Sequence, residues 1–149
     1  MMIGTIEPSR RSALQISMPL KLTLKPDEKV LIGTAVLTNV GSKAEIIIQN
    51  TVPVLREKDI ITEENADTLV KKIYFVILNM YVDSKNEQKF HDIYFKLVKE
   101  LFNAYPDQVI LALVMEVSQK ILQGNHYQAL KSCKKLLKFE AELLANVPG

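Results

Sequence analysis

The sequence predicts an α+β fold, in which a small antiparallel β-sheet precedes a bundle of about four helices. Two observations predict it. Apolar and polar residues alternate in short runs up to Ile60, and the apolar spacing becomes helical after that residue. Strands that come first and helices that follow are typical of α+β proteins. We therefore expect a β-rich region over 18–60 and a helical region over 61–149, packed together as one domain.

Alternation and turn residues predict three or four strands, arranged as a meander, over 20–24, 29–38, 45–49 and 52–54. The first strand alternates strictly, which places Lys21, Thr23 and Lys25 together on one face. Gly33 lies inside the second strand and suggests a bulge or bend. Pro53 cannot donate to a strand ladder, so the last extended segment is expected at an edge of the sheet.

The helices are expected over 66–81, 87 to about 102, 107–122 and 126 to about 145. The first is apolar almost all round from Ile73 onwards, which is typical of a central buried helix. Ser84 and Glu87 have the spacing of a capping box at the start of the second. Pro106 suits the first turn of the third helix. The Gly124-Asn125 pair is expected to end that helix and to cap the last one.

Composition limits the class of protein. The chain has 149 residues and a formal charge of +2, so any nucleic-acid site must be a local feature. The single cysteine, Cys133, cannot form an internal disulfide, and no apolar run approaches the ~18–20 residues of a membrane span. We therefore expect a cytoplasmic protein. Residues 1–17 are interpreted as a disordered leader, with Met18 as an alternative start.

The motifs of enzymes and metal sites are weak. The histidines His91 and His126 are far apart in sequence and show no zinc spacing. His126 and Cys133 could share a helix face, but two ligands do not make a site, and Cys133 is interpreted as a core thiol. There is no glycine-rich phosphate loop and no nucleophile elbow. The sequence predicts no catalytic residue, no metal and no cofactor.

The first basic feature combines Lys21 and Lys25 on the first strand with Arg56 and Lys58 just after the sheet. If the strands fold back, these cations could contact the phosphates and unstacked bases of single-stranded RNA. The alternative is a solvated sheet face with a salt bridge from Arg56 to an acid. Periodicity alone favours the alternative.

The second basic feature is a stripe on the last helix, formed by Lys131, Lys134, Lys135 and Lys138. Their spacing of three and four residues places them on one face. Such a stripe could attract RNA phosphates or an acidic partner. The alternative is the soluble outer face of an amphipathic helix.

Four segments resemble the FlbT family of flagellum biosynthesis regulators: 18–26, 54–60, 71–81 and 124–136. They occur in the family's order, and the similarity extends from about Met18 to Leu144. The resemblance implies a post-transcriptional regulator that binds the 5′ untranslated region of flagellin messenger RNA and promotes its decay, although some family members act positively. It also implies a FlaF-type flagellar protein as a partner.

A second resemblance concerns the N-terminal region alone. Residues 22–33 and 54–57 are similar to two motifs of the carbon storage regulator CsrA family, although Leu24 and Leu55 replace a basic residue and a histidine. The resemblance implies that Lys25 and Arg56 contact RNA, with Thr23 and Glu57 alongside, and that the chain could form a homodimer.

Two hypotheses follow. In the first, the sheet binds flagellin leader RNA through Lys21, Thr23, Lys25, Arg56 and Lys58, and Arg56→Ala weakens binding without unfolding the chain. This requires that Lys25 and Arg56 are neither far apart nor locked in internal carboxylate pairs. In the second, the helical bundle binds flagellin or a FlaF-type partner in an apolar groove, as a protein-interaction or chaperone module.

Overall fold

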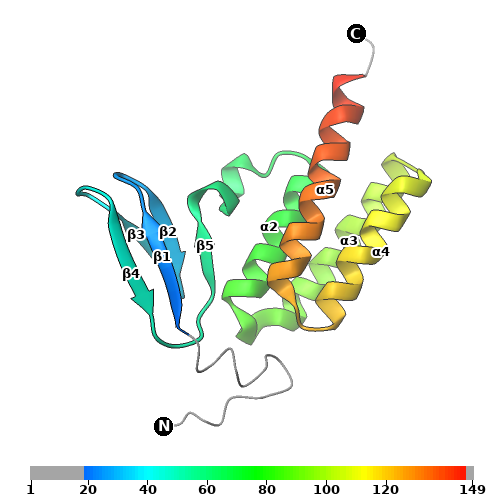
Figure 1. The fold of residues 1–149 in the computed structure, drawn as a ribbon. Coiled ribbons are helices and arrows are strands. Elements are labelled where there is room, and N and C mark those ends of the chain that lie inside the picture. Colours follow the sequence, from blue (N-terminus) through cyan, green and yellow to red (C-terminus); the bar gives the residue numbers. More distant parts are fainter. Residues whose placement is uncertain (1–18, 147–149) are drawn as a thin grey trace. The chain divides into compact units, whose positions relative to one another are not determined.

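A computed structural model describes residues 19–146, which form five β-strands and four α-helices (Figure 1). The predicted α+β class is confirmed. The chain divides into two compact units at Ile60/Ile61, which we call the sheet unit and the helical unit. Within the described residues, no helix is long and apolar enough to cross a bilayer. The leader expected over 1–17 lies outside the described part of the chain.

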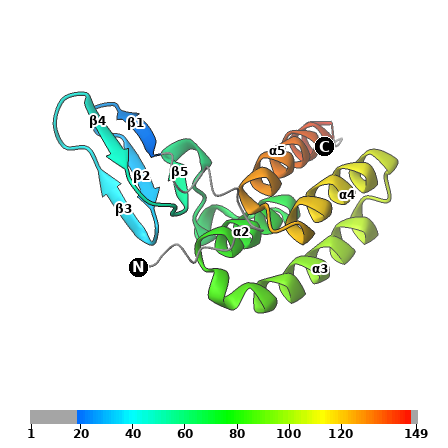
Figure 2. The same cartoon turned by 60° about the horizontal axis from the view of Figure 1, so that its bottom comes forward.

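The strands of the sheet unit are β1 (Leu20–Leu24), β2 (Lys29–Ile32), β3 (Ala35–Thr38), β4 (Ala44–Ile48) and β5 (Val54–Arg56). They form a two-stranded sheet of β1 and β4 and a three-stranded sheet in the order β3-β2-β5, all antiparallel (Figure 2). The expected meander is therefore wrong in its strand order. Strand β1 pairs with β4, and β2 pairs with β5, so strands distant in sequence become neighbours.

The core of the sheet unit follows the alternation of the first strand. Leu22 and Leu24 are each 6% exposed and form a cluster with the fully buried Val30. Partly buried apolar side chains from the neighbouring strands pack against this cluster: Ile32, Ile46, Ile48 and Val54. Because successive side chains of a strand point to opposite faces, this burial leaves Lys21 and Lys25 exposed.

The single strand predicted over 29–38 is instead a hairpin of β2 and β3. Ile32 pairs with Ala35 across a two-residue turn of Gly33 and Thr34. Gly33 has a φ of +64°, and its N–H donates to the carbonyl of Pro53 at 2.8 Å. A glycine with positive φ in the first position of a two-residue turn suits the right-handed twist of a hairpin. Gly33 therefore reverses the chain and does not form a bulge.

The helical unit consists of α2 (Leu69–Val82), α3 (Glu87–Ala104), α4 (Gln108–Leu122) and α5 (His126–Ala145). Helix α2 packs against both α3 and α5, and α5 also packs against α4 (Figure 1). The central position predicted for the first helix is confirmed by its buried residues, which are Val70, Ile73, Tyr74, Val76, Ile77, Leu78 and Met80.

Helix capping follows the prediction at one helix start and departs from it at two. Asn125 caps α5 as predicted, because its Oδ1 accepts a hydrogen bond from the N–H of Gln128. Pro106 does not lie in the first turn of α4, because Asp107 caps this helix through the N–H of Val109 at 2.7 Å and Pro106 precedes the cap. The capping box expected at 84–87 is wrong: residues Ser84–Asn86 form a 3-10 turn, and no side chain caps α3. The carboxylate of Glu87 faces two histidines instead of the backbone.

A buried carboxylate joins the C-terminal half of α5 to the start of α2. Glu140 is only 5% exposed. Its Oε1 accepts a hydrogen bond from the hydroxyl of Thr68 at 2.6 Å, and its Oε2 accepts one from the N–H of Val70 at 3.2 Å. Negative charge is favourable at a helix N-terminus, where backbone N–H groups lack partners. This carboxylate therefore completes a cap whose other part, Thr68, is local.

Candidate nucleic-acid interface

The structure brings Thr23, Lys25 and Arg56 together around one acidic side chain, Glu28. Arg56 Nη1 donates to the carbonyl oxygen of Thr23 at 3.1 Å and to Glu28 Oε2 at 3.2 Å. Glu28 Oε1 accepts a hydrogen bond from the N–H of Lys25 at 2.9 Å. The pairing of β2 with β5 makes this possible, because it places Arg56 opposite Val30 in the sheet.

Glu28 holds Arg56 in an internal ion pair. The side chains of Arg56 and Glu28 are 35% and 18% exposed. The pKa of Glu28 lies below its ordinary value, first because of the hydrogen bond from the Lys25 N–H and then because of Arg56, although desolvation opposes the shift. Glu28 therefore stays ionised at neutral pH and neutralises the guanidinium. The condition set for the RNA hypothesis fails for Arg56, and a phosphate must compete with Glu28 for this residue.

The three lysines of the predicted site are more accessible. Lys21 lies 3.5 Å from Glu45 in an ion pair whose side chains are both mostly exposed. Such surface pairs contribute about 0–1 kcal/mol and are screened by salt. Lys25 and Lys58 are exposed and form no ion pair within residues 19–146. Lys25, unlike Arg56, is therefore not locked in an internal pair with a carboxylate.

The backbone that carries Lys25 is held by the side chain of one asparagine, which lies in the segment between β3 and β4. Asn39 Nδ2 lies within hydrogen-bond distance of the carbonyl oxygens of Leu24, Lys25 and Ser42, at 3.2, 3.0 and 2.9 Å. The backbone of Asn39 adds two bonds, from the Asp27 N–H to its oxygen and from its N–H to Glu28. The position of Lys25 therefore depends on a residue fourteen positions away.

The lysine stripe lies on the exposed side of α5, and part of it contacts the helical unit itself. Lys135 Nζ lies 2.9 Å from Glu116 Oε2, and Lys131 Nζ lies 5.1 Å from the centre of the Tyr127 ring. The hydrogen bond from Lys135 is the main reason that the pKa of Glu116 lies below its ordinary value. Lys131 and Lys135 thus have partners within the unit, which favours the amphipathic-helix interpretation for that part of the stripe.

An exposed apolar stripe on α4 was not predicted. Leu111, Met115 and Leu122 are 40%, 63% and 73% exposed. Their spacing places them on one face of the helix. The sequence signal was available, since these residues extend the apolar character of α4 beyond the single stripe that an amphipathic helix needs. Exposed apolar surface of this kind is typical of protein contacts when it is contiguous.

Comparisons with known proteins agree on one family. A family model described as "Flagellar protein FlbT" matches residues 20–144. A probable flagellum biosynthesis repressor protein FlbT of Rhodopseudomonas palustris is 40% identical over 128 residues, which cover 86% of this chain and 99% of that protein. The Flagellum biosynthesis repressor protein FlbT of Caulobacter vibrioides is 34% identical, over 87% of this chain and 92% of that protein.

No solved structure matches the chain. The resemblance to the carbon storage regulator family is not confirmed by the comparisons. The RNA-contact roles that this resemblance implies for Lys25 and Arg56 therefore stay predictions.

Proposed function

This chain belongs to the FlbT family, and on that premise we propose that it regulates flagellum biogenesis after transcription, by binding the 5′ untranslated region of flagellin messenger RNA. Its relatives are named flagellum biosynthesis repressors, which supports a regulatory role in that process. Binding promotes decay of the transcript, so that flagellin supply follows flagellum assembly.

One observation carries the RNA proposal: Lys25 is exposed, makes no ion pair within the described residues, and stands on a backbone held by Asn39. A fixed backbone presents the lysine at a defined place and so reduces the conformational entropy that RNA binding costs, and phosphate contacts supply a large share of the affinity for RNA. Lys21 and Lys58 add accessible positive charge. The region 19–60 contains no aromatic residue, so recognition depends on charge and backbone groups and not on base stacking.

Arg56 has a different role in this proposal from the one that the sequence suggested. It joins β5 to β1 and to the turn at Glu28, so Arg56→Ala removes a link of the sheet unit as well as a positive charge. Lys25→Gln is the cleaner test, since it leaves these hydrogen bonds intact.

We expect Lys25→Gln to weaken binding of flagellin leader RNA and to lower the salt dependence of binding. Each phosphate contact to a single strand contributes a slope of about 0.7 in log K against log salt, so the slope should fall by about that amount. The measurement is a fluorescence-anisotropy titration of leader RNA at several salt concentrations. Lys72→Gln, which removes an exposed lysine from α2, is the matched control. Equal slopes for both variants and the parent would remove Lys25 from the interface.

Glu28→Gln tests whether Arg56 can contact RNA once its carboxylate partner is neutral. We expect leader RNA to bind about fivefold more tightly. A carboxylate about 4 Å from a bound phosphate repels it by ~1 kcal/mol in water, and the glutamine side chain removes this repulsion. Asp27→Asn removes a negative charge from the same turn without touching Arg56, and asparagine tolerates the positive φ of 64° there. If the two variants gain affinity equally, Arg56 is a structural residue and contributes only general charge.

A second candidate function is favoured by the apolar stripe on α4. In this alternative the helical unit binds a protein, either flagellin or a FlaF-type partner, and effects on RNA are indirect. The discriminating experiment titrates the purified chain separately with leader RNA and with flagellin. Tight binding to flagellin without binding to RNA would select the alternative. Loss of that binding in Met115→Lys, with RNA binding unchanged, would assign the stripe to the protein partner.

A further inference from the structure

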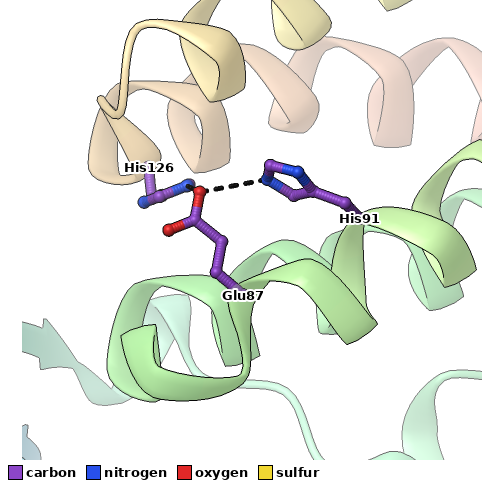
Figure 3. A group of neighbouring side chains, drawn as sticks. All are labelled: Glu87, His91 and His126. Atoms are coloured by element: carbon purple, nitrogen blue, oxygen red, sulfur yellow. Dashed lines mark ion pairs between the residues drawn. The ribbon is translucent and has the colours of Figure 1, made fainter.

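Three side chains of the helical unit converge on one point between the starts of two helices (Figure 3). Glu87 is the first residue of α3, His91 lies one turn later, and His126 is the first residue of α5. Glu87 Oε2 lies 3.0 Å from His91 Nε2 and 3.2 Å from His126 Nε2. The three ligand-type atoms all lie within 4.8 Å of one another.

The two imidazole nitrogens are buried and do not have hydrogen-bond partners in the described structure. His91 Nε2 and His126 Nε2 are both buried, and neither meets hydrogen-bond geometry with the nearby carboxylate. Buried polar atoms are satisfied in the great majority of cases, so an exception requires an explanation. Two unsatisfied nitrogens that face one carboxylate oxygen have the arrangement of ligands around a shared centre.

We propose that Glu87, His91 and His126 bind a divalent transition-metal ion, with zinc as the preferred metal. Bonds of about 2.0–2.1 Å to a tetrahedral zinc place neighbouring ligand atoms about 3.3 Å apart, close to the two distances in this cluster. Nitrogen ligands select a first-row transition metal over magnesium or calcium, which prefer oxygen. Three protein ligands leave a fourth position for water or for a group of a bound partner.

The chemistry of the three side chains suits a metal site, because imidazole nitrogen and carboxylate oxygen are both zinc ligands in proteins. Cys133, which the sequence paired with His126, is not part of the cluster: it is fully buried, and burial raises the pKa of its thiol.

The metal would strengthen the contact between the starts of α3 and α5. Helix α3 packs against α2 and, to a smaller extent, α4, while α5 packs against α2 and α4. The starts of α3 and α5 already approach each other where Glu87 Oε2 lies 3.2 Å from His126 Nε2, and a shared ion would hold them together at that point. Glu87 and His91 are four residues apart on α3, a spacing that places both side chains on the same face of that helix. The third ligand, His126, comes from α5. This site is independent of the RNA role proposed for the sheet unit.

The test is a zinc titration of the metal-free full chain against a chromophoric chelator, with cobalt absorption as a second readout. We expect one ion per chain and a cobalt spectrum typical of tetrahedral coordination. Loss of a group that only orients a metal ligand lowers metal affinity by about 10–100-fold. Glu87→Gln and His126→Gln remove ligands themselves, so each should lower zinc affinity by at least about 100-fold. The matched control is Glu116→Gln, which makes the same carboxylate-to-amide change on α4, outside the cluster. This variant should bind zinc like the parent.

Thermal unfolding separates a specific site from loss of the fold. Zinc at about one hundred times its dissociation constant should raise the Tm of the parent by about 5–10 °C and leave His126→Gln unchanged. Circular dichroism of the metal-free variants checks that each one folds, and His91→Gln serves as the second ligand variant if one fails. Absence of zinc binding by the parent, or equal binding by parent and folded ligand variants, would overturn the proposal.

Discussion

Glu140→Ala is expected to destabilise the helical unit by about 2–6 kcal/mol, because it leaves two donors without an acceptor at a buried position, at about 1–3 kcal/mol each. The hydroxyl of Thr68 and the N–H of Val70 both donate to this carboxylate, and the side chain is 5% exposed. Alanine leaves both donors without a partner and opens a cavity between α5 and the start of α2. The free energy of unfolding, measured by urea titration with circular dichroism, reports the loss.

The matched control is Glu142→Ala, which truncates an exposed glutamate two residues further along α5. A surface change of this kind should alter stability by no more than about 0.5 kcal/mol. The free energy of unfolding of Glu140→Gln should lie between those of Glu140→Ala and Glu142→Ala, since the amide oxygen of glutamine still accepts a hydrogen bond but carries no charge. If Glu140→Ala and Glu142→Ala were equally stable, the carboxylate at the start of α2 would not contribute to the fold.

Asn39→Ala is expected to destabilise the sheet unit by about 2 kcal/mol, since hydrogen bonds contribute about 1 kcal/mol each and the two N–H groups of the amide are shared among three carbonyl groups. The loss should be local, because Asn39 connects the end of β1 with the turn at Ser42. Amide hydrogen exchange by NMR measures it, with faster exchange at residues 25–28. The released backbone also carries Lys25, so leader RNA should bind more weakly than to the parent.

Asn50→Ala, an exposed asparagine after β4, is the control for this change. Unaltered exchange at residues 25–28 in Asn39→Ala would show that the turn is held by other contacts. Altered exchange with unaltered RNA binding would place the RNA interface elsewhere, since Lys25 would then be irrelevant to affinity.

Local patterns predicted the local features of this protein well. The strict alternation over 20–24 predicted β1 and its buried face, because the side-chain period of a strand is two residues. The Gly124-Asn125 pair predicted both a helix end and a helix start, since Gly124 adopts a φ of +75° and Asn125 caps the next helix. These interactions join residues within one turn, so the order of residues contains the information that they require.

Two local predictions were wrong for physical reasons. Gly33 was interpreted as a bulge or bend inside one strand because the residues on both sides favour strands, but the N–H that it donates to Pro53 is visible only after β5 has paired with β2. Ser84 and Glu87 had the spacing of a capping box, but the helical unit places His126 beside the Glu87 carboxylate. In both cases a partner distant in sequence decided between two conformations that were locally acceptable.

By itself, the sequence determined the α+β class, the buried faces of β1 and α2, and the resemblance to the family. Only the tertiary structure decided which charged and polar groups meet: Arg56 with Glu28, His126 with Glu87, and Glu140 with Thr68. Periodicity and capping depend on neighbours within one or two turns, whereas these contacts depend on how strands pair and helices pack. Chemistry that depends on the convergence of distant side chains therefore appears only when the chain has folded.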